Sequence, residues 1–501
     1  MTTVETFIPP QAGQKIMKKY TIMKEINYQM PLVLGLTLLA SASCQNRQVK
    51  QNTADNRRPN ILFIAIDDLR PELGCYGNNI ISSPNIDRLA SQSVTFSRAY
   101  CNVPVSGASR ASLLTGTRPT SYRFLTFDTR ADRDYPEAVT LPEHFRQNGY
   151  YTVSLSKVFH NEGDCKNAWD EEWRPSGEGT WRNYLTEENL RIDTLIKRGM
   201  PFEAADVPDS AYFDGKTAQR AIRSIRKLKD SGKPFFLAVG FLKPHLPFNA
   251  PKKYWDMYDP SEIGIAQNPE PPADAPPQAI HNWGELRQYY SIPEKGALTD
   301  SAANKLRHGY YACVSYTDTL IGELLDELQK NGLSENTIVI LWGDHGWNLG
   351  EHGMWCKHCN FNTSLNAPLV IKVPGLTNGK TNSNITEFID IYPTLCELSE
   401  LDLPHHLEGQ SLVKRLKKPE KNEDDFAVCK FNNGVTLIEE NHFYTEWINK
   451  NDSTVANMFY DHTTDPDENI NLSGKQEYAQ MVSLLAGRLK EKRGTAFLKP
   501  E

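Results

Sequence analysis

Four side chains of types that bind metal ions occur as two adjacent pairs, which lie far apart in this 501-residue sequence: Asp67 with Asp68, and Asp344 with His345. Two neighbouring carboxylates repel each other, and a cation between them removes that repulsion. A turn in water would also accommodate such a pair, because solvent screens the charges. The two pairs therefore predict a metal site if the fold brings them together.

A third candidate is the stretch S-G-A-S-R-A-S-L-L-T-G-T-R, which runs from Ser106 to Arg118. Its first residue offers a hydroxyl group, and Ala108 and Arg110 follow two and four positions later. A serine-rich loop that leads into an ordinary helix would have the same composition. A serine hydroxyl is a weak nucleophile unless another group activates it. The stretch therefore indicates covalent catalysis only together with other features.

Continuous apolar runs precede both candidate ligand pairs. Residues 61–66 read I-L-F-I-A-I, and residues 337–342 read T-I-V-I-L-W. Such runs are typical of strands that are buried on both faces, as in a sheet sandwiched by helices. Open α/β sheets bind ligands at the carboxyl ends of their strands. We therefore predict an α/β fold in which two strands deliver both pairs to one edge of the sheet.

Further polar side chains follow two more strand-like runs, residues 151–155 and 235–241. They are Lys157, His160 and His245, and a further lysine, Lys357, comes twelve residues after His345. Taken singly, each of these is more commonly a surface or capping residue. Their repeated position just beyond predicted strand ends favours a place in the same site.

The rest of the chain predicts elements around this sheet. Residues 302–331 show a helical spacing of apolar residues that is typical of core packing. Residues 259–300 are rich in Pro and Ala, and such a long loop often shapes a substrate cleft. Residues 425–460 carry short strand-like runs, and a final helix is predicted at 475–492.

Composition narrows the function further. Hydrophobic residues make up 39% of the chain and charged residues 23%, which indicates a folded globular protein. The net charge of −7 argues against a nucleic-acid-binding protein, although it is compatible with a local basic pocket for an anionic substrate. Cys356 and Cys359 have the spacing of half a zinc site, but the sequence holds no second such pair, so zinc is disfavoured there.

The N-terminal region predicts export. A basic segment near Met17 precedes residues 31–42, an apolar run that is too short to span a bilayer, for which a buried core helix is the alternative. We predict a leader over residues 1–44, with Cys44 as a candidate lipid anchor, and a polar tether over 45–58. The expectation is a periplasmic or membrane-anchored lipoprotein of a Gram-negative-type bacterium. Export would allow some of the nine cysteines to pair.

Together these features resemble the type I sulfatase family. In that family a Cys or Ser, followed two positions later by Pro or Ala and four positions later by Arg, is oxidised to the aldehyde formylglycine. Ser106, Ala108 and Arg110 match the Ser version of this signature. The resemblance covers residues 57–472. Four further motifs look most like the iduronate-2-sulfatase branch: Asp344-His345, Lys157-Val158-Phe159-His160, Lys243-Pro244-His245 and Gly350-Glu351-His352-Gly353.

The resemblance implies a fold and a cofactor. The fold is alkaline-phosphatase-like, a mostly parallel sheet sandwiched by helices, with a catalytic domain at 59–400 and a smaller C-terminal α+β subdomain at 401–501. One Ca²⁺ ion is implied, in a ligand set that is rich in oxygen. The implied ligands are Asp67, Asp68, Ser106, Asp344 and His345. His345 stands where asparagine is commoner in the family.

The resemblance also implies a reaction, the hydrolysis of a sulfate ester by the hydrate of formylglycine at position 106. One hydroxyl of the hydrate attacks sulfur, and the other later expels sulfate. The implied roles are orientation of the hydrate by Arg110, binding of sulfate oxygens by Lys157 and Lys357, proton transfer at the hydrate by His160, and protonation of the leaving alcohol by His245. The branch implies a sulfated glycan substrate, a 2-O-sulfated uronic acid of a glycosaminoglycan-type chain. A formylglycine-generating maturation enzyme is the implied transient partner.

Two other functions are compatible with the same residues. The first is a metal-dependent phosphatase or phosphodiesterase of the alkaline-phosphatase superfamily, with direct attack by Ser106. Such sites usually hold two zinc ions and gather more His and Asp than the single four-ligand set found here. The second is an inactive exported glycan-binding protein, in which Ser106 is never modified.

Overall fold

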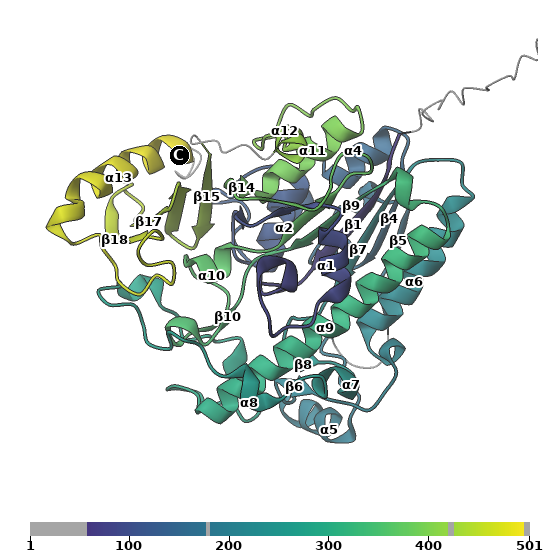
Figure 1. The fold of residues 1–501 in the computed structure, drawn as a ribbon. Helices are drawn as coiled ribbons and strands as arrows, with labels where there is room; N and C mark the ends of the chain where they lie inside the picture. The colour runs from purple at the N-terminus through teal and green to yellow at the C-terminus, as the bar shows by residue number, and fades with distance from the viewer. Residues whose placement is uncertain (1–57, 177–180, 419–424, 495–501) are drawn as a thin grey trace, which may run out of the picture. The chain divides into compact units, whose positions relative to one another are not determined.

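An eight-stranded, mostly parallel sheet forms the centre of the structure, a computed structural model that describes residues 58–176, 181–418 and 425–494 (Figure 1). The strands lie in the order β13-β2-β12-β9-β1-β7-β4-β5. Their bounds are Asn60–Ile66 (β1), Val94–Phe96 (β2), Tyr151–Ser156 (β4), Glu171–Trp173 (β5), Phe235–Phe241 (β7), Thr337–Gly343 (β9), Leu369–Lys372 (β12) and Lys380–Asn382 (β13). The strands from β9 to β5 are parallel to one another, and β12 is antiparallel to both of its neighbours.

The central strands of this sheet are the apolar runs of the sequence. Every residue of β1, β7 and β9 is buried, as expected for strands covered by helices on both faces. Helices α1, α6 and α9 pack together on one face, and α2, α4 and α11 on the other (Figure 1). Their bounds are Pro84–Ala90 (α1), Ser106–Thr115 (α2), Leu141–Gln147 (α4), Phe213–Lys229 (α6), Asp300–Lys330 (α9) and Ile391–Leu398 (α11). The predicted α/β sandwich is confirmed.

The long helix α9 confirms the helix predicted at 302–331. The side chain of Thr299 caps its start by accepting a hydrogen bond of 3.3 Å from the backbone N–H of Ala302. Gly332 lies just beyond its end with a φ of 69°, a conformation that favours glycine and ends helices. Leu320 and Leu324 are buried, in agreement with the core packing that their spacing predicts.

Asp318 of α9 joins this helix to the start of α1. Its buried carboxylate accepts hydrogen bonds from the backbone N–H groups of Asn85 and Ile86, over 3.1 and 2.7 Å. N–H groups in the first turn of a helix have no partner within that helix. We therefore expect Asp318→Ala to lower the free energy of unfolding by about 2 kcal/mol, measured by urea denaturation, because it leaves buried donors unpaired.

The matched control for this prediction is Asp326→Ala on the same helix. Asp326 pairs with Arg88, and its side chain is 65% exposed. An exposed ion pair contributes little, so the free energy of unfolding should change by less than about 1 kcal/mol. Similar losses in the two variants would show that the hydrogen bonds of Asp318 do not stabilise the junction.

The C-terminal part forms a four-stranded antiparallel sheet with one helix packed on it (Figure 1, yellow). The elements are β15 (Phe426–Phe431), β16 (Gly434–Glu439), β17 (His442–Ile448), β18 (Thr454–Asp461) and α13 (Ala479–Arg493). Successive side chains of a strand point to opposite faces. Ala427 and Cys429 accordingly belong to the core around the central sheet, whereas Val428 packs with Leu485 of α13 in a second core. The sheet and helix agree with the predicted α+β elements, and the domain boundary at residue 400 stays a prediction.

The predicted leader, its candidate anchor Cys44 and the tether as far as residue 57 lie outside the described residues. Within the described ranges, no helix is both long and apolar enough to cross a membrane. The eight cysteines from Cys75 onward carry free thiols, so that part of the chain holds none of the disulfides that export would allow. Cys356 and Cys359 belong to neither of the two clusters of metal-binding side chain types found there.

Candidate active site

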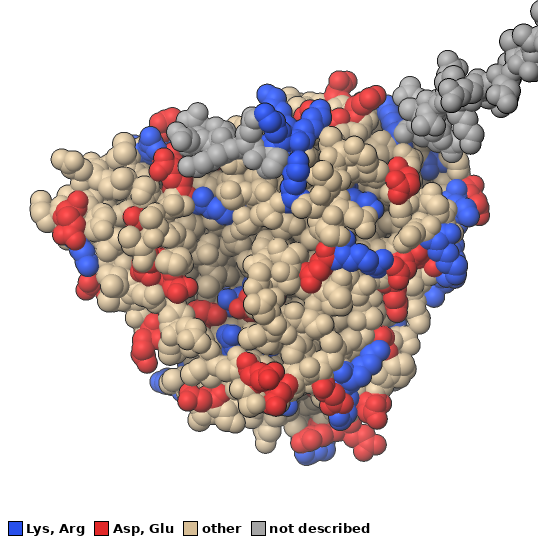
Figure 2. Space-filling model, in the orientation of Figure 1, with Lys and Arg blue, Asp and Glu red and all other residues tan. Residues whose placement is uncertain are grey.

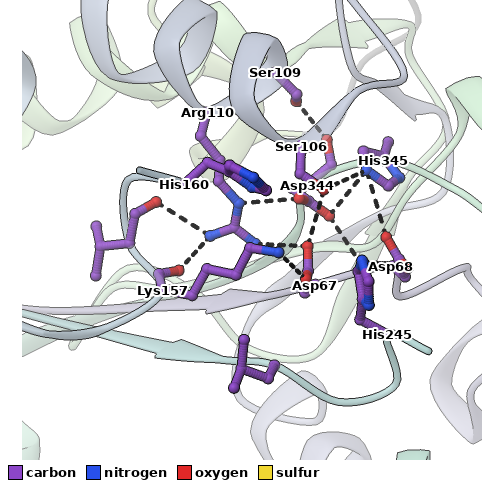
Figure 3. Close-up of polar contacts among 12 residues, drawn as sticks. Asp67, Asp68, Ser106, Ser109, Arg110, Lys157, His160, His245, Asp344 and His345 are labelled. Atoms are coloured by element: carbon purple, nitrogen blue, oxygen red, sulfur yellow. Dashed lines mark hydrogen bonds and ion pairs between the residues drawn. The ribbon is translucent and has the colours of Figure 1, made fainter. Parts of the chain in front are cut away.

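The register of the central sheet brings the two ligand pairs together (Figure 3). β1 and β9 run in parallel with Ile66 opposite Gly343, so Asp67 and Asp344 leave the sheet side by side. The backbone N–H of Asp344 donates to the carbonyl of Ile66 over 3.1 Å. The N–H of Asp68 donates to Oδ1 of Asp344 over 3.0 Å. Two segments that are far apart in sequence therefore meet at the carboxyl edge of the sheet, as predicted.

The four side chains form one buried cluster. Candidate ligand atoms of Asp67, Asp68, Asp344 and His345 lie within 4.8 Å of one another, and none of these residues is exposed. Oδ2 of Asp68 is buried without a hydrogen-bond partner. Three carboxylates in this space repel one another, and a divalent cation would relieve the repulsion and satisfy the unpaired oxygen. The donor set therefore fits a metal ion.

The carboxyl groups of this cluster differ in acidity. Burial raises the pKa of Asp68 well above its usual range and raises the pKa of Asp344 to about 6. Burial also acts on Asp67, but the charge of Lys157 and other cations outweighs it and holds the pKa of Asp67 well below its usual range. Burial lowers the pKa of His345 to about 3, so this imidazole is neutral at pH 7.

His345 presents an unprotonated nitrogen to the cluster. Its Nδ1 lies 3.0 Å from the carbonyl oxygen of Gly346, which can only accept a hydrogen bond, so Nδ1 carries the proton. The lone pair of Nε2 then faces Oγ of Ser106 at 3.0 Å and the carboxylates of Asp68 and Asp344 at 3.5 and 3.6 Å. A neutral imidazole in this orientation can bind a metal ion through Nε2.

Ser106 is the first residue of α2 and only 3% exposed. Its Oγ lies 3.1 Å from Oδ1 of Asp67, within reach of the metal-binding cluster. The residue after it has to be small, because a Cβ on Gly107 would lie 2.4 Å from the carbonyl oxygen of Phe127. The free N–H groups at the start of a helix favour negative charge nearby. The backbone of α2 therefore supports an anionic group at position 106.

Arg110 lies one turn after the start of α2 and connects three segments of the site. Its buried guanidinium donates from Nε to Oδ2 of Asp344 over 3.0 Å and from Nη2 to Oδ1 of Asp67 over 3.3 Å. Nη1 donates to the carbonyl of Val158 over 3.1 Å. Arg110 therefore fixes α2 relative to the ends of β1 and β9 and to the segment that follows β4.

Two lysines lie beside the carboxylates of the cluster. Nζ of Lys157 pairs with Oδ2 of Asp67, and Nζ of Lys357 donates to Oδ1 of Asp68 over 2.8 Å. Lys357 also lies 3.6 Å from Oε2 of Glu285. Burial disfavours the charge of Lys357, but Asp68 and Glu285 outweigh it and raise the pKa of this lysine. Lys357 is therefore cationic at neutral pH.

A cavity of about 770 Å³ gives access to the site. Five of the predicted site residues line it: Ser106, Lys157, His160, His245 and Lys357. The other five are fully buried: Asp67, Asp68, Arg110, Asp344 and His345. Basic and acidic side chains are largely interspersed on the surface shown in Figure 2. Basic side chains outnumber acidic ones in the cavity lining, which includes Arg174 and Arg198 as well as the two lysines, in a chain whose net charge is negative.

Two of the three histidines that line the cavity, His160 and His245, are neutral in the absence of a ligand. Nδ1 of His245 lies 2.6 Å from the carbonyl oxygen of Leu246, and its Nε2 lies 3.8 Å from Oδ2 of Asp68 and 3.2 Å from Oε1 of Glu285. Burial lowers the pKa of His160 and of His245 well below the usual range, and nearby lysines add to this effect. A negatively charged ester in the cavity would raise the pKa of His245 again and favour a proton on its Nε2.

Two residues that contact His245 were not predicted from the sequence. Glu285 belongs to the segment 259–300, which was predicted to shape a cleft, and it contacts both His245 and Lys357. The indole of Trp181 packs edge-on against the imidazole of His245, with ring centroids 5.0 Å apart. Neither residue lies in a periodic or motif-like stretch, so no sequence signal distinguishes it from other Glu or Trp residues.

The fold and the site define a class of proteins, the alkaline-phosphatase-like hydrolases with a metal site at the carboxyl edge of the sheet. Within this class, the model of the sulfatase family matches residues 59–401. A second model, described as the C-terminal part of N-sulphoglucosamine sulphohydrolase, matches residues 350–495. The chain belongs to the sulfatase family and is a sulfuric ester hydrolase.

Known relatives agree with this assignment. Iduronate 2-sulfatases of Homo sapiens and Mus musculus are each 34% identical to this chain. The matches cover 79% and 78% of this chain, respectively, and 80% of each relative. A sulfatase of Formosa agariphila is 32% identical, over 93% of this chain and 92% of its own. A protein solved in complex with its substrate D-glucosamine-2-N,6-O-disulfate shares the fold, with a TM-score of 0.71 at 22% identity over 88% of this chain and 98% of that one.

Proposed function

We propose that the enzyme removes the 2-O-sulfate of a terminal uronic acid in a glycosaminoglycan-type chain, by means of formylglycine made from Ser106. The position of Ser106 carries the proposal. Its Oγ lies 3.1 Å from Asp67 at the start of a buried helix, in a cavity that is also lined by Lys157 and Lys357. The identity of 34% to iduronate 2-sulfatases, over most of both chains, supports the choice of sugar.

Ca²⁺ is the metal ion that we propose for the buried cluster. Its ligands would be Asp67, Asp68, Asp344 and His345 together with residue 106. A bound cation would offset negative charge that develops around the sulfate group. Oxygen donors outnumber nitrogen donors in this set, which supports calcium rather than zinc. Arg110 would keep the carboxylates of Asp67 and Asp344 in place, since it donates a hydrogen bond to each.

The side chains that line the cavity would supply the nucleophile, bind the sulfate and transfer protons. The aldehyde form of residue 106 supplies, as its hydrate, a nucleophile that can later release sulfate without a second nucleophile. Lys157 and Lys357 would hold sulfate oxygens as point charges. His160 would take up and return a proton at residue 106. His245 would donate a proton from Nε2 to the oxygen of the leaving alcohol, with Glu285 at 3.2 Å to stabilise the protonated ring.

His245→Ala is expected to slow the hydrolysis of sugar sulfates by about 100-fold or more and that of aryl sulfates much less. The reason is that an alkoxide needs a proton in order to leave, whereas a phenolate leaves unaided. The measurement is kcat/KM for a 2-O-sulfated uronate disaccharide and for 4-nitrophenyl sulfate. His442→Ala, in β17 and outside the cavity lining, is the control. Equal losses on both substrates would rule out the role of His245 as the acid.

The proposed substrate is tested with protein made together with a formylglycine-generating maturation enzyme, its proposed transient partner. We expect release of sulfate from a disaccharide with a terminal 2-O-sulfated uronic acid, with kcat/KM at least about 100-fold above that for a 6-O-sulfated glucosamine. Preference for the glucosamine would contradict the proposed sugar. Turnover of phosphate esters with bound zinc would favour the phosphatase. Tight binding of the disaccharide without turnover would favour the glycan-binding protein.

We further propose that the enzyme is exported and that Cys44 is its lipid anchor. The basic segment near Met17 and the short apolar run at residues 31–42 support this proposal, since they have the order of an export signal. Mass spectrometry of the protein from its native membrane fraction tests it. A mature N-terminus at Cys44 with added lipid mass is expected, and retention of residues 1–43 would contradict it.

A further inference from the structure

Two arginines, Arg174 and Arg198, line the cavity in addition to the two lysines beside the carboxylates. The guanidinium of Arg198 lies over the rings of Trp181 and Tyr289, 5.5 and 5.4 Å from their centroids. Its Nη2 donates to Oε1 of Gln288 over 2.8 Å. Trp181, Arg198 and Gln288 all line the same cavity as Ser106. Two aromatic rings and an amide thus hold this guanidinium at the cavity wall.

The charge of Arg198 is not paired with a carboxylate in the part of the chain that the structure describes. Within the described ranges, no carboxylate lies within 4.0 Å of its guanidinium, and Nη1 is buried without a hydrogen-bond partner. The nearby Arg182 is different, because Nε and Nη2 donate to the two oxygens of Asp193 over 2.7 and 3.0 Å. A buried donor without a partner destabilises the protein unless a ligand satisfies it. An anionic group of the ligand would pair with both the charge and the free N–H of Arg198.

The contacts of Trp181 relate Arg198 to the ester that is cleaved. His245 lies 3.8 Å from Asp68 at one end, and its ring meets Trp181 edge-on at 5.0 Å. The ring of Trp181 also contacts the guanidinium groups of Arg198 and Arg182, at 5.5 and 5.7 Å from its centroid, so Trp181 contacts both Arg198 and the proposed acid. A sugar whose ester oxygen meets His245 would pass along Trp181 and reach Arg198 with another of its substituents. The lysines would already be occupied by the sulfate that is cleaved.

We propose that Arg198 binds a second anionic group of the substrate, a carboxylate or a further sulfate, in addition to the sulfate ester at position 106. This inference rests on the proposed function, in which the substrate is a sulfated glycan. A planar guanidinium binds a carboxylate or a sulfate through two parallel hydrogen bonds, which a lysine cannot form. Arg198 is thus a specificity-determining residue that selects multiply charged sugars over simple sulfate esters.

The test compares two substrates in the holoenzyme. The first is a disaccharide with a terminal 2-O-sulfated uronic acid, and the second is 4-nitrophenyl sulfate, which carries a single charge. We expect Arg198→Ala to lower the ratio of kcat/KM between the disaccharide and the aryl sulfate by about 10- to 100-fold, the range typical of a lost charge-assisted hydrogen bond. Arg198→Lys should recover only part of this ratio, because it restores the charge without the second donor.

The same experiment identifies the anionic group. If the carboxylate is the partner, reducing the uronate carboxyl to an alcohol should lower kcat/KM of the wild-type enzyme by the same factor as Arg198→Ala does. The same change of substrate should then lower kcat/KM of the Arg198→Ala variant little further. If a disaccharide that lacks its other sulfates gives this result instead, with a loss in the wild type and little further loss in the variant, the partner is a sulfate. Arg191→Ala, an exposed arginine of helix α5 (Glu187–Ile196) that does not line the cavity, is the control for charge alone.

Equal losses of Arg198→Ala on both substrates, or none on either, would overturn the inference. The thermal midpoint of each variant is measured so that a folding defect is not mistaken for loss of binding. A wild-type enzyme that hydrolyses the aryl sulfate but no uronate sulfate would instead overturn the proposed sugar. The comparison is then repeated with the sulfated sugar that the enzyme does hydrolyse. If the protein binds the disaccharide without turnover, the dissociation constants of wild type and Arg198→Ala give the same answer.

Discussion

Ser106→Ala is expected to abolish sulfate release, with kcat/KM at least about 10,000-fold below that of the wild type, because it removes the atom that would become the aldehyde oxygen. Mass spectrometry of the peptide that contains Ser106 is the companion measurement. In wild-type protein from its own maturation system, this peptide should be two hydrogens lighter than the unmodified one and should react with an aldehyde reagent. Both signals should be absent from the variant.

Ser112→Ala is a matched control on the same helix. Its hydroxyl donates to the carbonyl of Thr117 and takes no part in the cavity lining. This variant should keep the modification at Ser106 and nearly all of the activity. Unmodified Ser106 in fully active wild-type protein would contradict the proposed mechanism and would favour direct attack by the serine hydroxyl. Unmodified Ser106 in inactive protein would favour the glycan-binding alternative.

Removal of the proposed Ca²⁺ ion is expected to lower kcat/KM by at least about 1,000-fold, or roughly 4 kcal/mol of transition-state stabilisation, and to lower the thermal midpoint. The physical reason is the repulsion among Asp67, Asp68 and Asp344, whose ligand atoms lie within 4.8 Å of one another. Dialysis against a calcium chelator gives the apoprotein, and elemental analysis gives the metal content. Readdition of Ca²⁺ should restore both activity and thermal midpoint.

Asp68→Asn tests whether this loss comes from the buried cluster. It removes one charge and leaves a side chain of similar shape, so the metal content and the calcium-dependent shift of the thermal midpoint should both fall. Asp256→Asn, an exposed residue that pairs with Lys252 on the surface, is the control and should retain both. If the chelator changes neither the activity nor the thermal midpoint of the wild-type protein, the result would contradict a calcium site. Restoration by Zn²⁺ alone would contradict the choice of ion.

The sheet and the buried cluster could be predicted because their signals are local. The runs that became β1 and β9 are apolar throughout, which is the pattern of strands buried on both faces. Paired ligands directly after such strands can meet at one sheet edge, and Asp67 and Asp344 do. The signature that begins at Ser106 predicted that Ser106 and Arg110 belong to the site, and the structure places both residues at the cluster.

The remaining part of the site comes from segments without such a signal. Glu285 lies in an irregular stretch of the 259–300 segment, and Trp181 and Arg198 flank a short helix, α5, that is mostly exposed. Their positions depend on the path by which the long connecting segments fold back over the carboxyl edge of the sheet. No periodicity in 3.6 or two residues specifies such a path, so these contacts emerge only from packing between distant segments.

Any enzyme that converts Ser106 has to act before the C-terminal sheet docks. Strand β15 holds the segment before this serine, because the N–H of Lys430 donates to the carbonyl of Asn102 over 2.7 Å. Lys430 follows Ser106 by 324 residues (430 − 106), so the ribosome needs roughly 15 to 65 seconds to reach it at about 5–20 residues per second. During synthesis, and for as long as the chain stays unfolded, the serine is accessible. Once β15 docks, only 3% of Ser106 is left within reach.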